Sequence, residues 1–312
     1  MSTTRPLRFG VMASGKVTSG AEWRAYARRI ADLGYDTLSL PNHLATQTLA
    51  PLPALVAAAD AAPSLRVGTL VIDNESVHPA VIANECATVD VLTDGRLEVG
   101  IGAGWLPADH TAIGQPWAPA GERIERLAEA VSVLRAVWDD APANVDGTHY
   151  RLRNFAAGAR PVQRPHPPIL IGGGGRRVLQ LAARVADIVS FVPNMAAGRV
   201  GPESAASATG AATRAKLAWV REAAGDRFDA LELHVNVTLV RLGDRSEGLA
   251  KVARAYATSE ADAAEVPHAL VGSVEEIAED VLRRRDELGL SYLTVFEGSI
   301  DAFAPVIARL RA

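Results

Sequence analysis

The sequence predicts an α/β protein that folds as a (β/α)8 TIM barrel with insertions after strands 4 and 7, in one domain over residues 1–312. The main observation is that strand and helix patterns alternate along the chain and form eight strand–helix units. The composition agrees, because 48% hydrophobic and 22% charged residues suit a large globular core. Single α/β barrels commonly reach this length, so the length alone does not require a second domain.

The first four strand–helix units occupy the first third of the chain. Short apolar runs predict strands at residues 8–13, 36–40, 65–72 and 96–101. Amphipathic or alanine-rich segments predict helices at residues 21–33, 52–61 and 79–92. Gly34 is the expected C-cap of the first helix, and Pro79 suits the first turn of the third.

The second half of the chain continues the pattern, with a long helix expected at residues 121–138 after a loop rich in proline and glycine. Strands five to eight are expected at residues 169–171, 187–192, 231–240 and 292–296. Further helices are expected at residues 203–224, 275–288 and 302–310. Residues 141–164 and 246–264 do not fit the repeat and are interpreted as the two insertions, the first lying over one end of the barrel.

Charge and hydropathy exclude several classes of partner. A net charge of -4 and an isoelectric point near 6.0 give no basic surface for nucleic acid. No apolar run approaches the roughly 18 residues that span a membrane, and the N-terminus has no signal-peptide pattern, so we expect a cytoplasmic protein. Cys86, the single cysteine, is expected to pack as a small apolar residue in a helix.

A run of glycines after the fifth strand is the most distinctive local motif. Gly172, Gly173, Gly174 and Gly175 separate this strand from a helix that begins with Arg176. Glycines permit positive φ and close approach of backbone N–H groups, and a helix N-terminus with arginine attracts phosphate. The pattern therefore predicts a phosphate site, with an ordinary tight turn as the alternative. Neither a dinucleotide fingerprint nor a P-loop is present, which argues against a Rossmann fold.

In a (β/α)8 barrel the ligand binds at the carboxyl ends of the strands. We therefore expect the residues that follow the strands to surround one cavity. They are Ser14, Asn42, His43, Asp73, Asn74, Gly102 to Trp105, Gly172 to Arg176, Pro193 and Asn194. His, Asp and Glu are not grouped at metal-ligand spacing, so no metal is predicted.

Several segments resemble one family. They are LGYDTLSLPNHL at residues 33–44, the block from LRVGTLVIDNES to LEVGIGAGW at residues 65–105, PVQRPHPPILIGGGG at residues 161–175 and LVGSVEEIAEDVL at residues 270–282. These motifs are similar, in residues and order, to the bacterial luciferase-like monooxygenase superfamily. That superfamily contains flavin-dependent monooxygenases and oxidoreductases that use the deazaflavin coenzyme F420, and the motifs from Asn42 to Trp105 look closer to the F420 branch.

The resemblance implies a cofactor that lies across the strand ends. Its phosphate would be held by the glycine run and Arg176, and the third strand would end in a bulge, often a non-proline cis peptide, at Leu70 and Val71. The cofactor-binding residues implied in this way are Asn42, Leu70, Val71, Asp73, Gly102, Gly104, Gly172, Gly173, Gly174, Gly175 and Arg176.

His43 is the candidate catalytic residue, because a histidine beside the reacting centre can donate or accept a proton. In the F420 branch the matching position is an Asp-His pair, whereas here Asn42 precedes His43. The imidazole is therefore expected to lack its charged neighbour, and a merely packed or solvated histidine is the alternative. Trp105 stands where some F420-dependent reductases carry an acid, and it is expected to form a wall of the substrate pocket.

The function implied is hydride transfer between F420 and a small organic substrate. One alternative is an FMN-dependent monooxygenase that uses O2 and a separate flavin reductase. Another is a barrel that binds a flavin or deazaflavin without turnover. A homodimer with no nucleic-acid or membrane partner is expected in each case.

Overall fold

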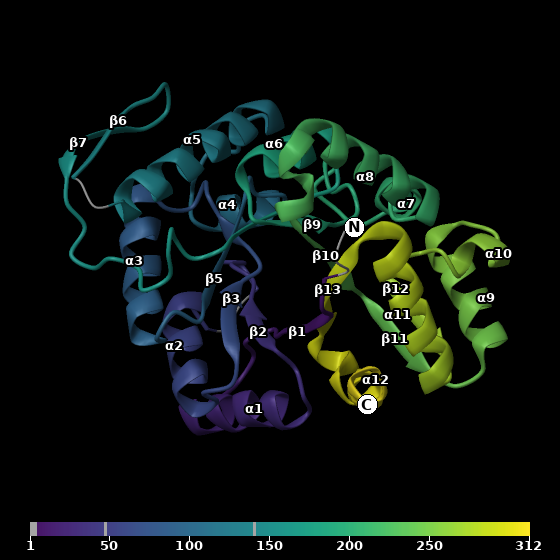
Figure 1. Cartoon of the computed structure of the whole chain (residues 1–312). Coiled ribbons are helices and arrows are strands. Elements are labelled where there is room, and N and C mark those ends of the chain that lie inside the picture. Colours follow the sequence, from purple (N-terminus) through teal and green to yellow (C-terminus); the bar gives the residue numbers. More distant parts are fainter. Residues whose placement is uncertain (1–4, 47–48, 140–141) are drawn as a thin grey trace. The chain divides into compact units, whose positions relative to one another are not determined.

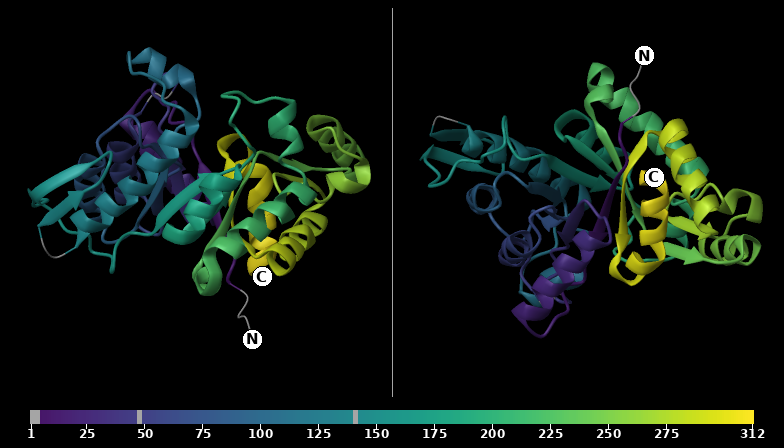
Figure 2. Two further views of the ribbon diagram at one scale, coloured as in Figure 1. Left: turned by 90° about the horizontal axis from the view of Figure 1, so that it is seen from above. Right: turned by 60° about the horizontal axis from the view of Figure 1, so that its bottom comes forward.

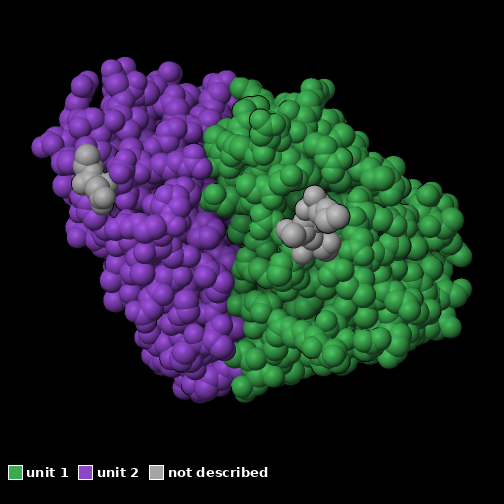
Figure 3. Space-filling model, in the orientation of Figure 1, with its two compact units in different colours: residues 1–13, 29–38, 172–312 green, residues 14–28, 39–171 purple. Residues whose placement is uncertain are grey.

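The structure is a computed structural model that describes residues 5–46, 49–139 and 142–312 (Figure 1). The chain divides into two compact units, which Figure 3 shows in different colours. Unit 1 contains residues 1–13, 29–38 and 172–312. Unit 2 contains residues 14–28 and 39–171. The chain therefore passes between the units several times, twice within a strand.

The strands of unit 2 are arranged around β5 (Leu97–Gly102), which pairs in parallel with β3 (Arg66–Thr69), β4 (Ile72–Asp73) and the first residues of β8 (Ile169–Gly173). The last residues of β2 (Thr37–Leu40) also belong to this unit. Its helices are most of α1 (Gly20–Asp32), then α2 (Pro51–Ala61), α3 (Pro79–Leu92), α4 (Pro107–Ala112) and α5 (Ala120–Trp138).

In unit 1 the strands lie in the order β1 (Arg8–Met12), β13 (Leu290–Phe296), β10 (Glu232–Val237) and β9 (Ile188–Phe191), and every pairing is parallel. The connecting helices are α6 (Arg176–Val185), α7 (Pro202–Ala206), α8 (Gly210–Ala224), α11 (Val274–Leu288) and α12 (Ile300–Arg311). A short 3-10 turn, Gly225–Ala230, leads from α8 into β10.

The predicted (β/α)8 class is confirmed by the strand order. The hydrogen-bonded order is β3-β2-β1-β13-β10-β9-β8-β5-β4, and β3 also pairs with β5. The strands β3 and β4 are two pieces of the predicted third strand, so nine strands correspond to eight barrel positions. Every residue of β5 and of β9 is buried, as expected for parallel strands that are covered on both faces.

The segments predicted as insertions contain regular secondary structure of their own. In unit 2, β6 (Ala143–Asp146) and β7 (Arg151–Phe155) form an antiparallel hairpin that extends outward beside α5 (Figure 2). Residue 141, where the first insertion was predicted to begin, lies outside the described residues. In unit 1, β11 (Leu239–Leu242) and β12 (Ala269–Gly272) form a parallel pair. The helices α9 (Arg245–Tyr256) and α10 (Glu260–Ala263) lie between them in the chain.

Three predicted elements were wrong in their limits. The seventh strand was predicted to end at Val240, but β10 ends at Val237 and the chain then enters β11. The single helix predicted at residues 203–224 is two helices, α7 and α8. The proline-rich loop predicted after Trp105 contains a helix, α4, in which Pro107 occupies the first turn.

Cys86 packs in α3 and is fully buried, which confirms its predicted role as an apolar residue. Burial also raises the pKa of its thiol, so the group stays protonated and unreactive. His78 is the N-cap of the same helix and accepts a hydrogen bond from the backbone N–H of Ala80. Pro79 lies in the first turn of this helix, as predicted.

A buried histidine joins three strands of unit 1. His234 on β10 contacts Ser190 Oγ on β9 at 2.7 Å and Thr294 Oγ1 on β13 at 2.8 Å, and it is fully buried. A neutral imidazole has one donor and one acceptor nitrogen, and the two hydroxyls satisfy both. Burial lowers the pKa of His234 to about 3, and burial likewise lowers the pKa of His268 to about 4. Both histidines are therefore neutral in the folded protein at physiological pH.

Stability should fall in mild acid because of these two groups. The unfolded chain binds a proton at each histidine near pH 6.5, whereas the folded protein does so only near their lowered values. Their contribution to the free energy of unfolding is therefore complete above about pH 6.5 and decreases as the pH falls below it. The variant His234→Gln should make this dependence shallower by about 1.4 kcal/mol per pH unit, measured by urea unfolding between about pH 6 and pH 5. Equal slopes in the variant and the wild type would contradict the assignment.

Candidate functional site

The third barrel strand is interrupted at its carboxyl end. The peptide bond between Leu70 and Val71 is cis, at the position where the family resemblance implied a bulge. Backbone hydrogen bonds hold this bulge to the second strand, because Leu70 N donates to Leu40 O at 2.8 Å and Asn42 N donates to Val71 O at 3.3 Å. The strand then resumes as β4, which ends at Asp73.

Alternate residues at the end of β5 are glycines because the interrupted strand lies against them. A Cβ atom on Gly100 would lie 2.0 Å from Thr69 O, and one on Gly102 would lie 2.7 Å from Val71 Cγ2. A Cβ atom on Gly104, which has φ of 70°, would lie 2.8 Å from the Asp73 carboxylate. The spacing G-x-G-x-G therefore reflects packing of one face of β5 against the bulge, which is a structural reason for Gly102 and Gly104 besides the predicted cofactor contact.

His43, the predicted catalytic residue, has a carboxylate partner that the sequence did not reveal. Its Nδ1 lies 2.7 Å from Asp109 Oδ2, and Asp109 Oδ1 accepts a hydrogen bond from Ala45 N at 3.0 Å. The expectation that Asn42 leaves the imidazole without a charged neighbour is therefore wrong. Asp109 lies on α4, 66 residues along the chain, and it is 4% exposed. The indole of Trp105 is perpendicular to the His43 ring, with the centroids 5.5 Å apart.

The next residue of α4 forms a second pair. His110 Nε2 lies 2.9 Å from Asp73 Oδ2, and the imidazole is 3% exposed. Trp117 packs on this ring with centroids 4.6 Å apart, and the guanidinium of Arg123 lies 3.7 Å from the Trp117 ring. Asp109 and His110 are adjacent in α4. Asp109 thus binds His43, which follows the second barrel strand, and His110 binds Asp73 at the end of β4.

Asn42 and the residues after Asp73 complete this cluster, and their side chains are engaged within unit 2. Asn42 Oδ1 accepts hydrogen bonds from Asp73 N and Ser76 Oγ, both at 3.4 Å. The buried Glu75 carboxylate pairs with Arg126 at 2.7 Å, and Asn74 Nδ2 donates to the Tyr150 hydroxyl at 3.0 Å. Asn42, Asp73, Asp109 and His110 line one narrow enclosed space together with Leu44, Ser76 and Ile113.

The glycine run of unit 1 has a different local geometry from the one predicted. Gly172 and Gly173 belong to β8, Gly175 is the N-cap of α6, and none of the four glycines has a positive φ. The expectation of positive φ was therefore wrong. A Cβ atom on Gly174 would lie 2.5 Å from the backbone of Asn194, whereas one on Gly175 would meet nothing within 4 Å. Gly174 is required by packing, and Gly175 leaves open space.

The beginning of α6 suits an anion. No side chain caps the helix at Gly175, and its first turn contains no acidic residue. The first N–H groups of a helix have no acceptor within the helix, and they carry the positive end of the helix dipole. Arg176 lies in this turn, but its guanidinium pairs with Glu222 at 3.3 Å and is 57% exposed. The open space at Gly175 and the uncapped N-terminus fit the phosphate of a flavin or deazaflavin.

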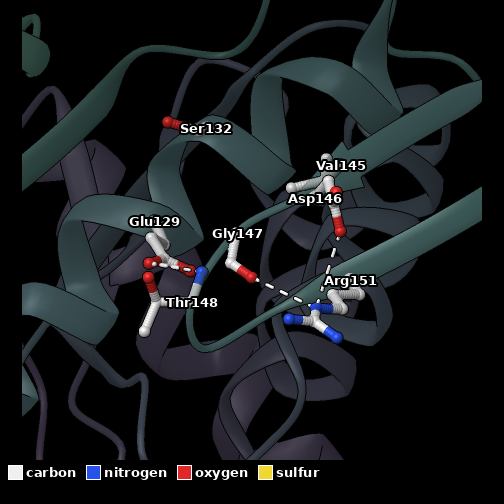
Figure 4. A pocket seen from close by; sticks show the side chains of 7 residues that line it. All are labelled: Glu129, Ser132, Val145, Asp146, Gly147, Thr148 and Arg151. Carbon is white, nitrogen blue, oxygen red and sulfur yellow. Dashed lines mark hydrogen bonds and ion pairs between the residues drawn. The ribbon is translucent and has the colours of Figure 1, made fainter.

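One pocket of unit 2 lies away from these residues. It has a volume of about 570 Å³ and lies between α5 and the β6–β7 hairpin (Figure 4). Glu129 accepts a hydrogen bond from Thr148 N at 3.0 Å, and Arg151 reaches Asp146 and Gly147. None of the predicted site residues lines this pocket, and its polar groups bind one another.

Within residues 5–46, 49–139 and 142–312, no three His, Cys, Asp or Glu side chains are grouped closely enough to hold a metal ion. Among the helices described, none combines the length and apolar character that crossing a membrane requires.

Comparisons with known proteins agree with the fold. The chain is 37% identical over 109 residues to the FMNH(2)-dependent dimethylsulfone monooxygenase of Pseudomonas putida, covering 35% of this chain and 30% of that protein. It is 32% identical over 194 residues to the F420-dependent glucose-6-phosphate dehydrogenase of Microbacterium testaceum, covering 59% of this chain and 56% of that protein. The chain thus spans between 30% and 56% of the length of these curated relatives.

Among solved structures, the coenzyme F420 dependent tetrahydromethanopterin reductase of Methanopyrus kandleri has the same fold, with a TM-score of 0.76. The match covers 97% of this chain and 98% of that chain at 14% sequence identity, so it bears on the fold alone. A family model, luciferase-like monooxygenase, matches residues 6–292. Because this match covers nearly the whole sequence, the chain belongs to the luciferase-like monooxygenase family.

Proposed function

We propose that this protein is an oxidoreductase that transfers a hydride between coenzyme F420 and a small organic substrate. The observation that carries the proposal is the pair formed by His43 and Asp109 after the second barrel strand. The match to an F420-dependent glucose-6-phosphate dehydrogenase supports the choice of cofactor. It extends over 194 residues, whereas the match to the FMNH(2)-dependent monooxygenase extends over 109. A cytoplasmic homodimer remains part of the proposal.

The pair gives His43 a defined chemical state. A carboxylate only accepts hydrogen bonds, so Nδ1 of His43 carries the hydrogen and Nε2 of the neutral ring carries the lone pair. When Nε2 takes up a proton, the Asp109 carboxylate stabilises the imidazolium and keeps its orientation. A bound F420 supplies or accepts the hydride. We assign to His43 the transfer of the proton that the substrate loses or gains when the hydride is transferred.

The cofactor phosphate is assigned to the glycine run, with Gly173, Gly174, Gly175 and Arg176 as the residues implied by the family resemblance. The uncapped first turn of α6 and the open space at Gly175 support this assignment. The proposal keeps Asn42, Leu70, Val71, Asp73, Gly102, Gly104 and Gly172 as further cofactor-binding residues. All follow or end barrel strands, where ligands of this fold bind.

A second candidate function is supported by the match to an FMNH(2)-dependent monooxygenase, which is higher in identity but shorter. In that case reduced FMN from a partner reductase would react with O2. A third candidate is cofactor binding without turnover. The His43–Asp109 pair favours catalysis over this last reading, because a site that only binds cofactor does not need an oriented proton acceptor.

Titration of the purified protein with F420 and with FMN at fixed salt tests the cofactor. We expect F420 to bind more tightly, and FMN binding about tenfold tighter, or about 1.4 kcal/mol, would reverse the assignment. Oxygen uptake should also be measured with each reduced cofactor and candidate substrates. Consumption of O2 that depends on substrate would favour the monooxygenase, and cofactor binding without reoxidation by any substrate would favour the third candidate.

Substitution of the pair tests the mechanism. His43→Ala should reduce turnover by about 10²- to 10⁴-fold with little change in cofactor affinity. Asp109→Asn should reduce turnover by about 10- to 100-fold, because an amide can donate to Nδ1 and favour the wrong tautomer. The matched control is Asp146→Asn, the same change at an exposed position of β6, which should leave turnover unchanged. Full activity in Asp109→Asn would show that the carboxylate has no part in the reaction.

The phosphate assignment is best tested at Gly175. A valine there has open space and a backbone φ of -101°, so Gly175→Val should change the free energy of unfolding by no more than about 1 kcal/mol. It should nevertheless weaken F420 binding by about tenfold or more, because the side chain occupies the space next to the N–H groups. Gly158→Val is the control, since a Cβ atom at Gly158 also meets nothing within 4 Å. Unchanged affinity in folded Gly175→Val would place the phosphate elsewhere.

A further inference from the structure

Unit 1 contains a buried lysine that neither the family resemblance nor the sequence pattern indicated. Lys216 lies on α8 and is 2% exposed. Its Nζ donates to two backbone carbonyl oxygens, Val192 O at 2.8 Å and Ser207 O at 2.7 Å. These carbonyls are the two ends of residues 192–207, the segment that follows β9. The ammonium group therefore closes this segment into a loop.

Within the described ranges Lys216 has no ionic partner, because no carboxylate oxygen there lies within 4.0 Å of its Nζ. Arg284, also buried in unit 1, likewise donates to backbone carbonyls, whereas the buried Arg123 of unit 2 stacks on Trp117. Burial lowers the pKa of Lys216 to about 8, which reflects the loss of hydration without a compensating negative charge. A buried, unpaired ammonium is costly, and a negative ligand nearby would offset this cost.

The closed loop supports the glycine run directly. Val192 N donates to Gly173 O at 3.2 Å, immediately beside the carbonyl that Lys216 holds. Asn194 N donates to Ser207 Oγ at 2.6 Å, at the other end held by Lys216. The backbone of residues 193–194 packs on Gly174 so closely that a Cβ atom there would lie 2.5 Å from it. One network of contacts thus joins the ammonium to the glycine run.

We propose that Lys216 is a positioning residue for the phosphate of the cofactor. It holds residues 192–207 against Gly174, and it provides the buried positive charge that the exposed, ion-paired Arg176 does not. This inference rests on the proposed function, because it takes the glycine run as the phosphate site. It adds to that function a residue that acts through the loop behind the site.

The alternative is a lysine that only stabilises the fold. The two roles differ in whether the effect of Lys216 depends on the phosphate of the ligand. A structural lysine, when lost, would weaken the binding of any ligand of this site equally. A residue that acts on the phosphate subsite would affect phosphorylated ligands and spare the same ring systems without phosphate.

The experiment uses the full chain and two matched ligand pairs. Dissociation constants are measured for FMN and riboflavin, and for F420 and the corresponding deazariboflavin without the phosphate. Lys216→Met should weaken both phosphorylated ligands by about tenfold or more and change the other two by no more than about twofold. Arg214→Met is the control at an exposed arginine of the same helix that pairs with Glu265, and it should change none of the four dissociation constants by more than about twofold.

A second variant keeps the test decisive if Lys216→Met does not fold. Ser207→Ala removes the hydroxyl that binds Asn194 N while the lysine stays in place, and it should give a smaller loss that is again confined to the phosphorylated ligands. Equal losses for ligands with and without phosphate, or an equal loss in Arg214→Met, would overturn the role of Lys216 alone. If the wild type binds neither FMN nor F420, the proposed function fails and this inference fails with it.

Discussion

The close packing of β5 against the interrupted third strand is the constraint on which the site of unit 2 depends. Gly100 and Gly102 of β5, and Gly104 two residues beyond it, must lack a side chain because the chain from Thr69 to Asp73 lies against them. The interruption allows β4 to end with Asp73 beside α4, where it binds His110. His110 in turn fixes α4, and α4 presents Asp109 to His43. The orientation of the candidate catalytic imidazole therefore depends on glycine at these three positions.

The candidate site of unit 2 and the surroundings of Lys216 in unit 1 differ in how buried charge is balanced. In unit 2 the buried carboxylates of Asp109 and Glu75 each have a cationic or imidazole partner, so the cluster is internally balanced. In unit 1 the ammonium of Lys216 is balanced only by carbonyl dipoles. Balanced pairs favour a fixed geometry for proton transfer, whereas an unbalanced cation favours the arrival of an anion. This contrast is what separates the assigned proton-transfer residues from the assigned phosphate-binding residues.

The sequence predicted the fold well, because parallel barrel strands are short apolar runs and each helix has one apolar face. The bulge at Leu70 and Val71 was predicted from family resemblance alone, and the catalytic role of His43 stays a prediction. The partner of His43 was missed because Asp109 is distant in the chain and its helix has only six residues. Pro107, followed two residues later by an acid, was the available signal of a helix start.

Other features could not be predicted from one sequence. A glycine can be required by a positive φ or by a closely packed neighbouring backbone. No glycine from Gly172 to Gly175 has a positive φ, and close packing of a backbone accounts for Gly174 but not for Gly175. In the sequence, Lys216 cannot be distinguished from a solvated lysine of an alanine-rich helix. Its burial depends on where residues 192–207 fold back. Burial of a polar residue by a loop is a tertiary effect that periodicity does not record.

The short helix α4 has a consequence for how this segment tolerates changes in length. Asp109 and His110 are adjacent, yet each binds a residue that follows a different strand. Each residue of an α-helix is rotated by about 100° from the last, so a single insertion or deletion before Asp109 would turn both side chains away from their partners. Loop exchange between relatives would therefore succeed only where the spacing from Trp105 to His110 is kept and Asp109 and His110 themselves are retained.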